Sequence, residues 1–201
     1  MIKKYFLFII SIIVCSLGDS LLYKANIGVN PVEAISLSLS YIFQVEVGTM
    51  TIIFYSVLII IQILMQKKLN LRTLLQIPLS LFIGVMINFW VYDILAGLKI
   101  SSYITNFSLA VLGLTISAIG VGMLVFLDLV TFPVEGISMK ISLLLNVNFQ
   151  KIRQLFDISS VVISIALTLM FQLDFAVREG TVIGAIIFSP IMAFSMRKLY
   201  S

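Results

Sequence analysis

The chain has 201 residues, of which 61% are hydrophobic and 11% are charged, and its formal net charge at pH 7 is +4. A soluble domain of this length needs more polar residues to cover its surface, and the mean hydropathy of +1.17 is correspondingly high. The sequence therefore predicts a membrane protein with the lipid bilayer as its main partner. The basic residues lie between apolar segments and at the chain ends, without interleaved aromatic residues, so we expect no binding of nucleic acid.

Six apolar segments are long enough to cross ~30 Å of hydrocarbon as α-helices. We expect these helices at residues 4–23, 49–66, 73–92, 104–127, 153–172 and 180–196. A helix satisfies its backbone polar groups within its own segment, as the interior of a bilayer requires. The predicted fold class is therefore an all-α polytopic membrane protein.

A short motif occurs twice in the chain, and its two copies lie 102 residues apart. The first copy is NPVEAISLSLS at residues 30–40, and the second is FPVEGISMKIS at residues 132–142. Of the ten positions that begin at the proline, six are identical. The sequence thus predicts an internal duplication within one membrane domain, with an N-terminal repeat over residues 1–98 and a C-terminal repeat over residues 99–201.

Each copy of the motif is typical of the start of a helix. Pro31 suits the first helical position, Asn30 the N-cap, and Glu33 a place where its carboxylate meets the free amides of the first turn. Pro133 starts the second copy in the same way. The predicted helices span residues 31–45 and 133–147. Each would be ~22 Å long at 1.5 Å per residue, which is too short to cross the bilayer, so we expect two re-entrant half-helices.

The distribution of Lys and Arg favours six crossings over eight. If the short helices only dip into the membrane, the face that carries both termini holds nine basic residues and the opposite face holds three. The nine are Lys3, Lys4, Lys67, Lys68, Arg72, Lys151, Arg153, Arg197 and Lys198, and the three are Lys24, Lys99 and Arg178. Eight crossings would divide the same residues seven to five. The positive-inside rule then predicts six crossings with both termini cytoplasmic. Each repeat would cross three times, so the two repeats would be inverted, as in many secondary transporters.

Acidic residues inside apolar segments are the main candidates for function, because an ionised group in hydrocarbon is costly unless it is paired or hydrated. Five of the nine acidic residues lie in or beside such segments: Asp19, Glu33, Asp128, Glu135 and Asp157. We expect Glu33 and Glu135 to approach each other near the pseudo-two-fold axis and to bind a cation or a protonatable substrate group. Asn26, Asp128 and Asp19 are further candidate ligands.

Structural roles are the alternatives for the same residues. Each glutamate could cap its own half-helix, where the positive end of the helix dipole stabilises a carboxylate. Asp157 could form an ion pair with Lys151 or Arg153 at the edge of the membrane. Asp19 and Asp128 could accept hydrogen bonds from free amides of the re-entrant segments.

Signals of catalysis are absent from the sequence. The chain has no histidine, which excludes His-based catalytic triads and HExxH zinc sites, and it has no GxGxxG or phosphate-loop pattern. We therefore expect no enzymatic activity, no cofactor and no metal site. The single cysteine, Cys15, excludes an intrachain disulfide.

The run ANIGVNPVE at residues 25–33, followed by Gly-Thr at the start of the next helix, resembles the YczE/YyaS/YitT family of bacterial integral membrane proteins. The pattern is Asn-x-Gly-x-x-Pro-x-acidic followed by Gly-Thr, and it fits at Asn26, Gly28, Pro31, Glu33, Gly48 and Thr49. The second copy departs from it, with Asp128 and Val130 at the matching places. The resemblance implies a multi-pass protein of the bacterial plasma membrane, in a family for which transport is the usual expectation.

The leading hypothesis is a small transporter or permease for a small molecule or an ion, with its site between the N-termini of the two half-helices. Because the chain is short, a homodimer that encloses the path is a further expectation. The alternative is a membrane scaffold or accessory subunit of a larger complex, which transports nothing itself.

Overall fold

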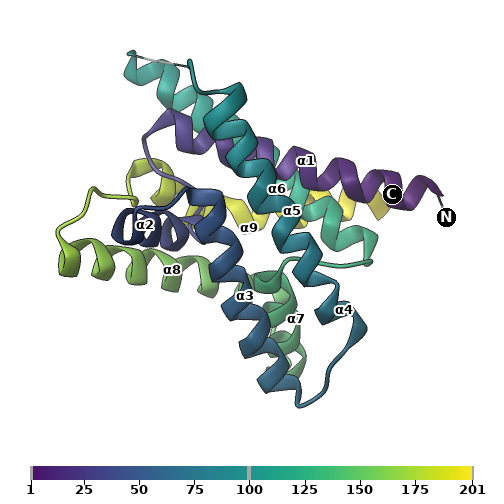
Figure 1. Ribbon diagram of the computed structural model, residues 1–201. Helices are drawn as coiled ribbons and strands as arrows, with labels where there is room; N and C mark the ends of the chain where they lie inside the picture. Colours follow the sequence, from purple (N-terminus) through teal and green to yellow (C-terminus); the bar gives the residue numbers. More distant parts are fainter. Residues whose placement is uncertain (1, 99–100, 201) are drawn as a thin grey trace.

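The computed structural model describes residues 2–98 and 101–200, and within these residues it is helical and contains no strand (Figure 1). Lys99, which entered the charge count, lies outside the described residues, as does the side chain of Lys198. The predicted boundary between the two repeats falls on the same gap. The all-α fold class is confirmed.

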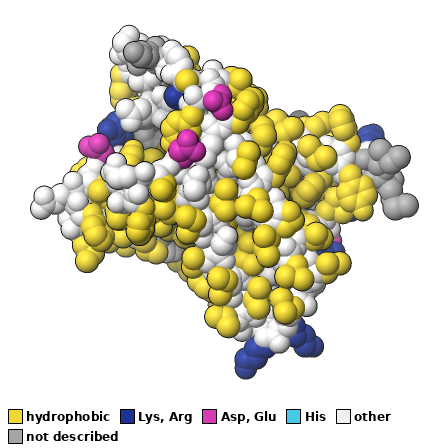
Figure 2. Space-filling view, in the orientation of Figure 1, with side chains coloured by type: hydrophobic (Ala, Val, Ile, Leu, Met, Phe, Trp, Pro, Cys, Tyr) yellow, Lys and Arg dark blue, Asp and Glu magenta, His cyan; other side chains and the backbone are white. Residues whose placement is uncertain are grey.

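Six helical segments are long and apolar enough to cross a membrane, at the places that hydropathy predicts. Five are single helices: α1 (Ile2–Ala25), α3 (Val47–Gln66), α6 (Tyr103–Leu127), α8 (Phe149–Phe171) and α9 (Glu179–Tyr200). The remaining segment consists of α4 (Leu71–Leu74), α5 (Gln76–Asn88) and the π-helical turn η1 (Phe89–Ile94). Hydrophobic side chains cover most of the visible surface in Figure 2, which suits contact with lipid.

The antiparallel pair of α1 and α6 forms the centre of the molecule, and glycines allow the two helices to approach closely. A Cβ atom on Gly18 would lie 2.4 Å from the backbone nitrogen of Ser117, and one on Gly120 would lie 2.8 Å from that of Cys15. Small residues at such crossings are typical of helix packing in membranes. Because residue numbers rise along α1 as those of its contacts fall along α6, the C-terminal ends of α1 and α6 lie at opposite ends of the bundle.

The two remaining helices, α2 (Glu33–Phe43) and α7 (Pro133–Leu145), have 11 and 13 residues. At 1.5 Å per residue they are ~17 and ~20 Å long. Helix α2 packs against α3 and α8, and α7 packs against the same two helices, α8 and α3. Their first turns are buried, whereas Phe43 and Leu143 near their C-terminal ends are 63% and 80% exposed. Both short helices therefore point their N-termini at the centre of the molecule.

The start of α2 differs from the prediction. Pro31 and Val32 form a turn, the helix begins at Glu33, and no side chain caps its N-terminus. Asn30 contributes to the start of the helix only through its backbone carbonyl, which accepts a hydrogen bond from the amide of Ala34 at 3.0 Å. The prediction that Asn30 is the N-cap is therefore wrong, because the added turn moves the helix start by two residues and leaves the Asn30 side chain available for other contacts. Pro133 does occupy the first position of α7, as predicted.

Candidate functional site

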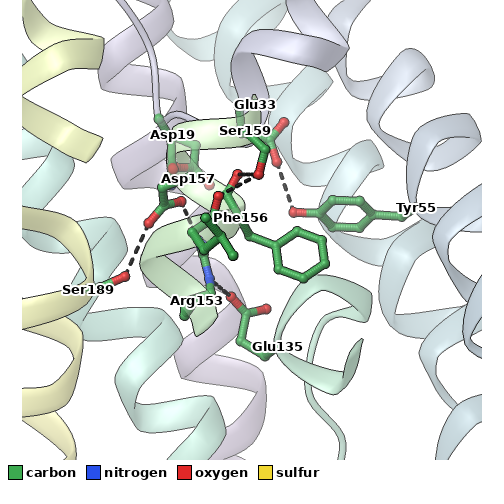
Figure 3. Close-up of polar contacts among 11 residues, drawn as sticks. Asp19, Glu33, Tyr55, Glu135, Arg153, Phe156, Asp157, Ser159 and Ser189 are labelled. Atoms are coloured by element: carbon green, nitrogen blue, oxygen red, sulfur yellow. Dashed lines mark hydrogen bonds and ion pairs between the residues drawn. The ribbon is translucent and has the colours of Figure 1, made fainter. Parts of the chain in front are cut away.

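An enclosed cavity lies where the N-termini of α2 and α7 meet α1, α3 and α8. Its volume of about 10 Å³ is close to the minimum that one water molecule needs. Four acidic or basic side chains line it: Asp19, Glu33, Glu135 and Arg153. The structure thus brings both glutamates of the repeated motif to one small space, together with Asp19 (Figure 3).

Glu33 is buried and accepts hydrogen bonds from three hydroxyl groups. Tyr23 of α1 and Thr51 of α3 donate to Oε2 at 3.0 and 2.9 Å, and Tyr55 of α3 donates to Oε1 at 2.8 Å. Hydroxyl donors of this kind stabilise a carboxylate in a site that excludes water. Neutral groups alone therefore surround Glu33 at hydrogen-bonding distance.

Thr51 has a second acceptor within reach. Its Oγ1 atom lies 2.9 Å from Oε2 of Glu33 and 3.0 Å from the backbone carbonyl of Val47. A hydroxyl group has one proton but can also accept a hydrogen bond. When Thr51 donates to the Val47 carbonyl, its oxygen can accept a hydrogen bond from the O–H of a neutral Glu33, so the same geometry fits both protonation states of the carboxyl group.

Glu135 is held in a different way, by a buried ion-pair network. Nε of Arg153 donates to Oε1 of Glu135 at 2.8 Å, and the Nη1 group of Arg153 also pairs with Asp157. Ser189 of α9 donates to Oδ2 of Asp157 at 3.1 Å (Figure 3). The guanidinium also lies over the ring of Phe188, 5.3 Å from its centroid, as in a cation–π contact. These contacts give Arg153 two carboxylate partners in the interior of the protein.

The place of Arg153 corrects the sequence prediction. Arg153 and Asp157 do form an ion pair, but Arg153 is 2% exposed and Asp157 is 0% exposed, so the prediction of a pair at the membrane edge is wrong. Helix α8 begins at Phe149, which places Arg153 one turn inside the helix, where Glu135 of α7 meets it. Removing Arg153 from the nine basic residues of the charge count leaves eight against three, so the preferred topology does not change.

Asp19 belongs to the cavity on the side of Glu33. Its Oδ1 atom accepts a hydrogen bond from Ser117 of α6 at 2.7 Å and a long one from Nδ2 of Asn30 at 3.5 Å. The thiol of Cys15 donates weakly to Oδ2 at 3.6 Å. The other side-chain atom of Asn30, Oδ1, is buried and has no hydrogen-bond partner. Asn30 thus lines the cavity, together with three carboxylates, and carries a buried carbonyl oxygen without a donor.

The candidate ligands Asn26 and Asp128 lie outside this cavity. They end α1 and α6 in the left-handed conformation, with φ angles of 52° and 46°, and both are exposed. Arg178 donates to the backbone carbonyl of Asn26 at 2.6 Å, and Arg72 pairs with the Asp128 carboxylate at 2.8 Å. Since α1 and α6 are antiparallel, these two contacts lie at opposite ends of the bundle.

Each contact borders an open pocket. The pocket near Asn26, here the α1-end vestibule, measures about 370 Å³ and is lined by residues that include Tyr23, Asn26, Leu37, Tyr41 and Arg178. The pocket near Asp128, here the α6-end vestibule, measures about 240 Å³ and is lined by residues that include Gln62, Arg72, Asp128, Gly136 and Met139. Tyr23 joins the first vestibule to Glu33, and Gly136 of the second is adjacent to Glu135.

The family of unknown function DUF6198 matches residues 2–197, which is nearly the whole chain. The chain belongs to this family. No curated protein and no solved structure matches the chain. The match to DUF6198 supports a membrane-type helical protein but gives no support for the YczE/YyaS/YitT resemblance.

The two glutamates of this DUF6198 protein lie in the first turns of α2 and α7, where the helix dipole favours a carboxylate, but they do not cap these helices by hydrogen bonds. Their hydrogen bonds go to side chains of α1, α3 and α8 rather than to the first amides of α2 and α7. Among the described residues, no three His, Cys, Asp or Glu side chains are placed to hold a metal ion together. The hydroxyl ligands Tyr23, Thr51 and Tyr55 were missed by the sequence analysis. Their only signal was the i, i+4 spacing of Thr51 and Tyr55 on one face of an apolar helix.

Proposed function

We propose that this DUF6198 protein is a small membrane transporter whose path runs from the α1-end vestibule, through the enclosed cavity, to the α6-end vestibule. The observation that carries the proposal is the position of a small cavity, lined by ionisable groups, between two open vestibules at opposite ends of the α1–α6 pair. Buried ionisable residues in a membrane protein commonly mark a path for ions or substrates, because burying an ionisable group away from water costs free energy.

The burial of the short helices supports six crossings with two re-entrant segments. Their N-termini lie at the cavity and their C-terminal ends are exposed, as in transporters whose broken helices meet near the midplane. Lys67, Lys68 and Arg72 then lie on the cytoplasmic face, near the α6-end vestibule. The α1-end vestibule opens to the other face.

The contacts between α1 and α6 support an inverted repeat. The offset of 102 residues makes Gly18 equivalent to Gly120 and Cys15 equivalent to Ser117. The close approach of Gly18 to Ser117 is therefore equivalent to that of Gly120 to Cys15, and both occur. Cys15 and Ser117 are themselves equivalent, and Sγ of Cys15 lies 3.7 Å from Oγ of Ser117. Equivalent residues in contact are what a pseudo-two-fold axis at this crossing would produce. An inverted repeat supplies two similar half-paths, one to each side of the membrane, which is the basis of alternating access.

Cysteine labelling tests the path. Leu37 and Met139 occupy equivalent positions in the two vestibules and are half-buried. We would place single cysteines at each in a Cys15→Ser background and measure their reaction with a membrane-impermeant maleimide in intact cells and in inverted vesicles. A cysteine at Val57, which lies mid-way along α3 and is 48% exposed, serves as the lipid-facing control.

The expected result is labelling of position 37 from outside the cell only, labelling of position 139 from the cytoplasm only, and no labelling of position 57. Labelling of both vestibule positions from the same face would exclude a path between them. If neither position reacts from either side, the vestibules are closed to water, and the scaffold or accessory-subunit role becomes the better description.

A further inference from the structure

We infer that the half of the cavity formed by Asp19, Asn30 and Glu33 binds one small monovalent cation, a sodium ion or a proton. The role of this cation in transport rests on the proposed function, but its binding does not. The inference also replaces the symmetric pair of Glu33 and Glu135 expected from the sequence with a site in the first half of the chain only.

Charge balance is the first argument. The buried network contains four carboxyl groups and one guanidinium, so it carries three net negative charges when all are ionised. The carboxyl groups are those of Asp19, Glu33, Glu135 and Asp157, and the guanidinium is that of Arg153. Buried charges require nearby opposite charges or neutralisation. Arg153 pairs with Glu135 and Asp157, and among the residues that line the cavity no further cationic side chain is available to Asp19 and Glu33. One bound cation offsets the charge of one of these two groups, and the Thr51 contact also fits a protonated Glu33, which removes a second charge.

Comparison of the two halves shows where a cation is missing. Arg153 and Asp157 lie 102 residues after Thr51 and Tyr55, so the guanidinium beside Glu135 takes the place of the hydroxyl group beside Glu33. The first half contributes only hydroxyl groups at these positions. The second half therefore contains a fixed cation beside its glutamate, and the first half contains none.

The first half instead has polar groups that the second half lacks. Asp19 and Asn30 correspond to Val121 and Phe132, which line the same cavity with apolar side chains. A carboxylate and an amide are therefore added on the side that has no guanidinium. These groups supply oxygen atoms, the ligands that hard cations prefer.

Asn30 provides independent evidence of a ligand. Asn30 is 5% exposed and lines the cavity, its Oδ1 atom is buried without a hydrogen-bond partner, and its Nδ2 atom is directed to Asp19. A buried carbonyl oxygen without a donor is unfavourable, and a bound cation satisfies it. The volume of about 10 Å³ admits an ion of the size of a water molecule and excludes an organic cation.

Intrinsic fluorescence provides a test, because Trp90 is the only tryptophan and its indole N–H donates to Ser16 of α1 at 3.1 Å, one turn before Asp19. Purified protein would be titrated with NaCl against choline chloride at constant ionic strength, at several pH values. Thermal unfolding in the same buffers provides a second measurement, since a cation that binds the folded state raises Tm. We expect a saturable response to Na⁺. Where one proton competes with Na⁺ for the site, the apparent affinity for Na⁺ should fall about tenfold for each unit by which the pH is lowered.

Three variants define the site. Asp19→Asn and Asn30→Ala should each weaken Na⁺ binding at least about tenfold, as expected for the loss of one ligand interaction of about 1.4 kcal/mol. Ser36→Ala, which removes a buried hydroxyl on α2 away from the cavity, is the matched control and should bind as the parent protein does. A response to pH without a response to Na⁺, lost in Asp19→Asn, identifies the cation as a proton.

The inference is overturned if neither Na⁺ nor pH between about 5 and 8 changes fluorescence or Tm in a manner that depends on Asp19, or if Ser36→Ala lowers the affinity as much as Asp19→Asn does. Both measurements use solubilised protein and do not require transport. Cation binding with failed vestibule labelling would therefore refute only the transporter, and two-sided labelling without cation binding would refute only this site.

Discussion

Substituting Arg153 by methionine is the perturbation for which the structure makes the sharpest energetic prediction. Arg153→Met retains an unbranched side chain of similar length and removes the only cationic partner of Glu135 and Asp157 within the described network. Both carboxyl groups are almost fully buried, so they can neither reach water nor find another cation. The variant must therefore bury two unpaired acidic groups or take up protons.

The magnitude follows from the burial of this network. Removal of one partner from a buried ion pair costs about 3–5 kcal/mol, much more than the roughly 0–1 kcal/mol of an exposed pair. For a chain of about 200 residues, 1 kcal/mol corresponds to roughly 2–4 °C in Tm. Arg153→Met should therefore lower Tm by about 6–20 °C. A triple variant that also carries Glu135→Gln and Asp157→Asn removes the unpaired charges and should recover most of this loss.

Thermal unfolding of the purified protein in one detergent, followed by circular dichroism, measures both effects. Arg72→Met is the matched control, because Arg72 forms an ion pair whose partners are 63% and 65% exposed, and its loss should change Tm by no more than about 4 °C. The reasoning is refuted if Arg153→Met and Arg72→Met have equal effects, or if the triple variant is less stable than Arg153→Met alone.

Three further predictions follow from single contacts. Tyr55→Phe removes a hydroxyl donor from Glu33 and should reduce the free energy of unfolding by about 1.5–3 kcal/mol, measured by chemical denaturation. Gly120→Val places a side chain against the backbone of α1 and should destabilise the α1–α6 crossing by at least about 1–3 kcal/mol, measured in the same way. Arg72→Ala breaks the contact with Asp128 and should increase the labelling rate of a cysteine in the α6-end vestibule without a large change in stability.

Each of these has its own control. Phe54→Leu alters the neighbouring ring on α3 without touching Glu33, so an equal loss in both variants would show that packing, not the hydrogen bond, explains the Tyr55 result. A Cβ atom on Gly97 would have no atom of the described residues within 4 Å, so Gly97→Val should leave the stability unchanged. An unchanged stability in Gly120→Val would contradict the close crossing. An unchanged labelling rate in Arg72→Ala would show that the exposed ion pair does not restrict the vestibule.

Hydropathy was sufficient to predict the six long helices, because a bilayer allows few other ways to satisfy the backbone over such apolar lengths. The two short helices were predictable from their prolines and length. Their common centre was also predictable, because the linkers before Pro31 and Pro133 are long enough to carry the N-termini inwards. These features depend on local sequence, and they are where prediction and structure agree best.

The interior network was only partly predictable, because its contacts join residues that are distant in sequence. Glu33 and Glu135 were identifiable as acidic residues in apolar segments, whereas Arg153 resembled a basic residue at a membrane edge. Only the packing of α7 on α8 shows that Arg153 is buried as the ion-pair partner of Glu135 and Asp157. The sequence favours Asn30 as a helix cap, but the turn at Pro31 and Val32 places the start of α2 at Glu33.

Asn26 and Asp128 illustrate a different limit. Their equivalence in the two halves is visible in the sequence, and the structure gives both the same left-handed backbone at the ends of α1 and α6. Helix α6 ends at Leu127, as predicted, and α1 continues two residues past its predicted end to Ala25, so both residues lie directly after their helices at the exposed ends. Their predicted role as ligands is untested, but the structure places them at the vestibules rather than with Glu33.

Paired labelling of cysteines at positions 37 and 139 tests the central claim most directly, when both rates are measured in the same membranes with and without Na⁺ and at two pH values. The account predicts access to the two vestibules from opposite faces, with one rate rising as the other falls when the cation is changed. It also predicts that Asp19→Asn abolishes this reciprocal change. Rates that do not respond to either cation, or access to both positions from one face, would contradict a transport path through the Glu33 cavity.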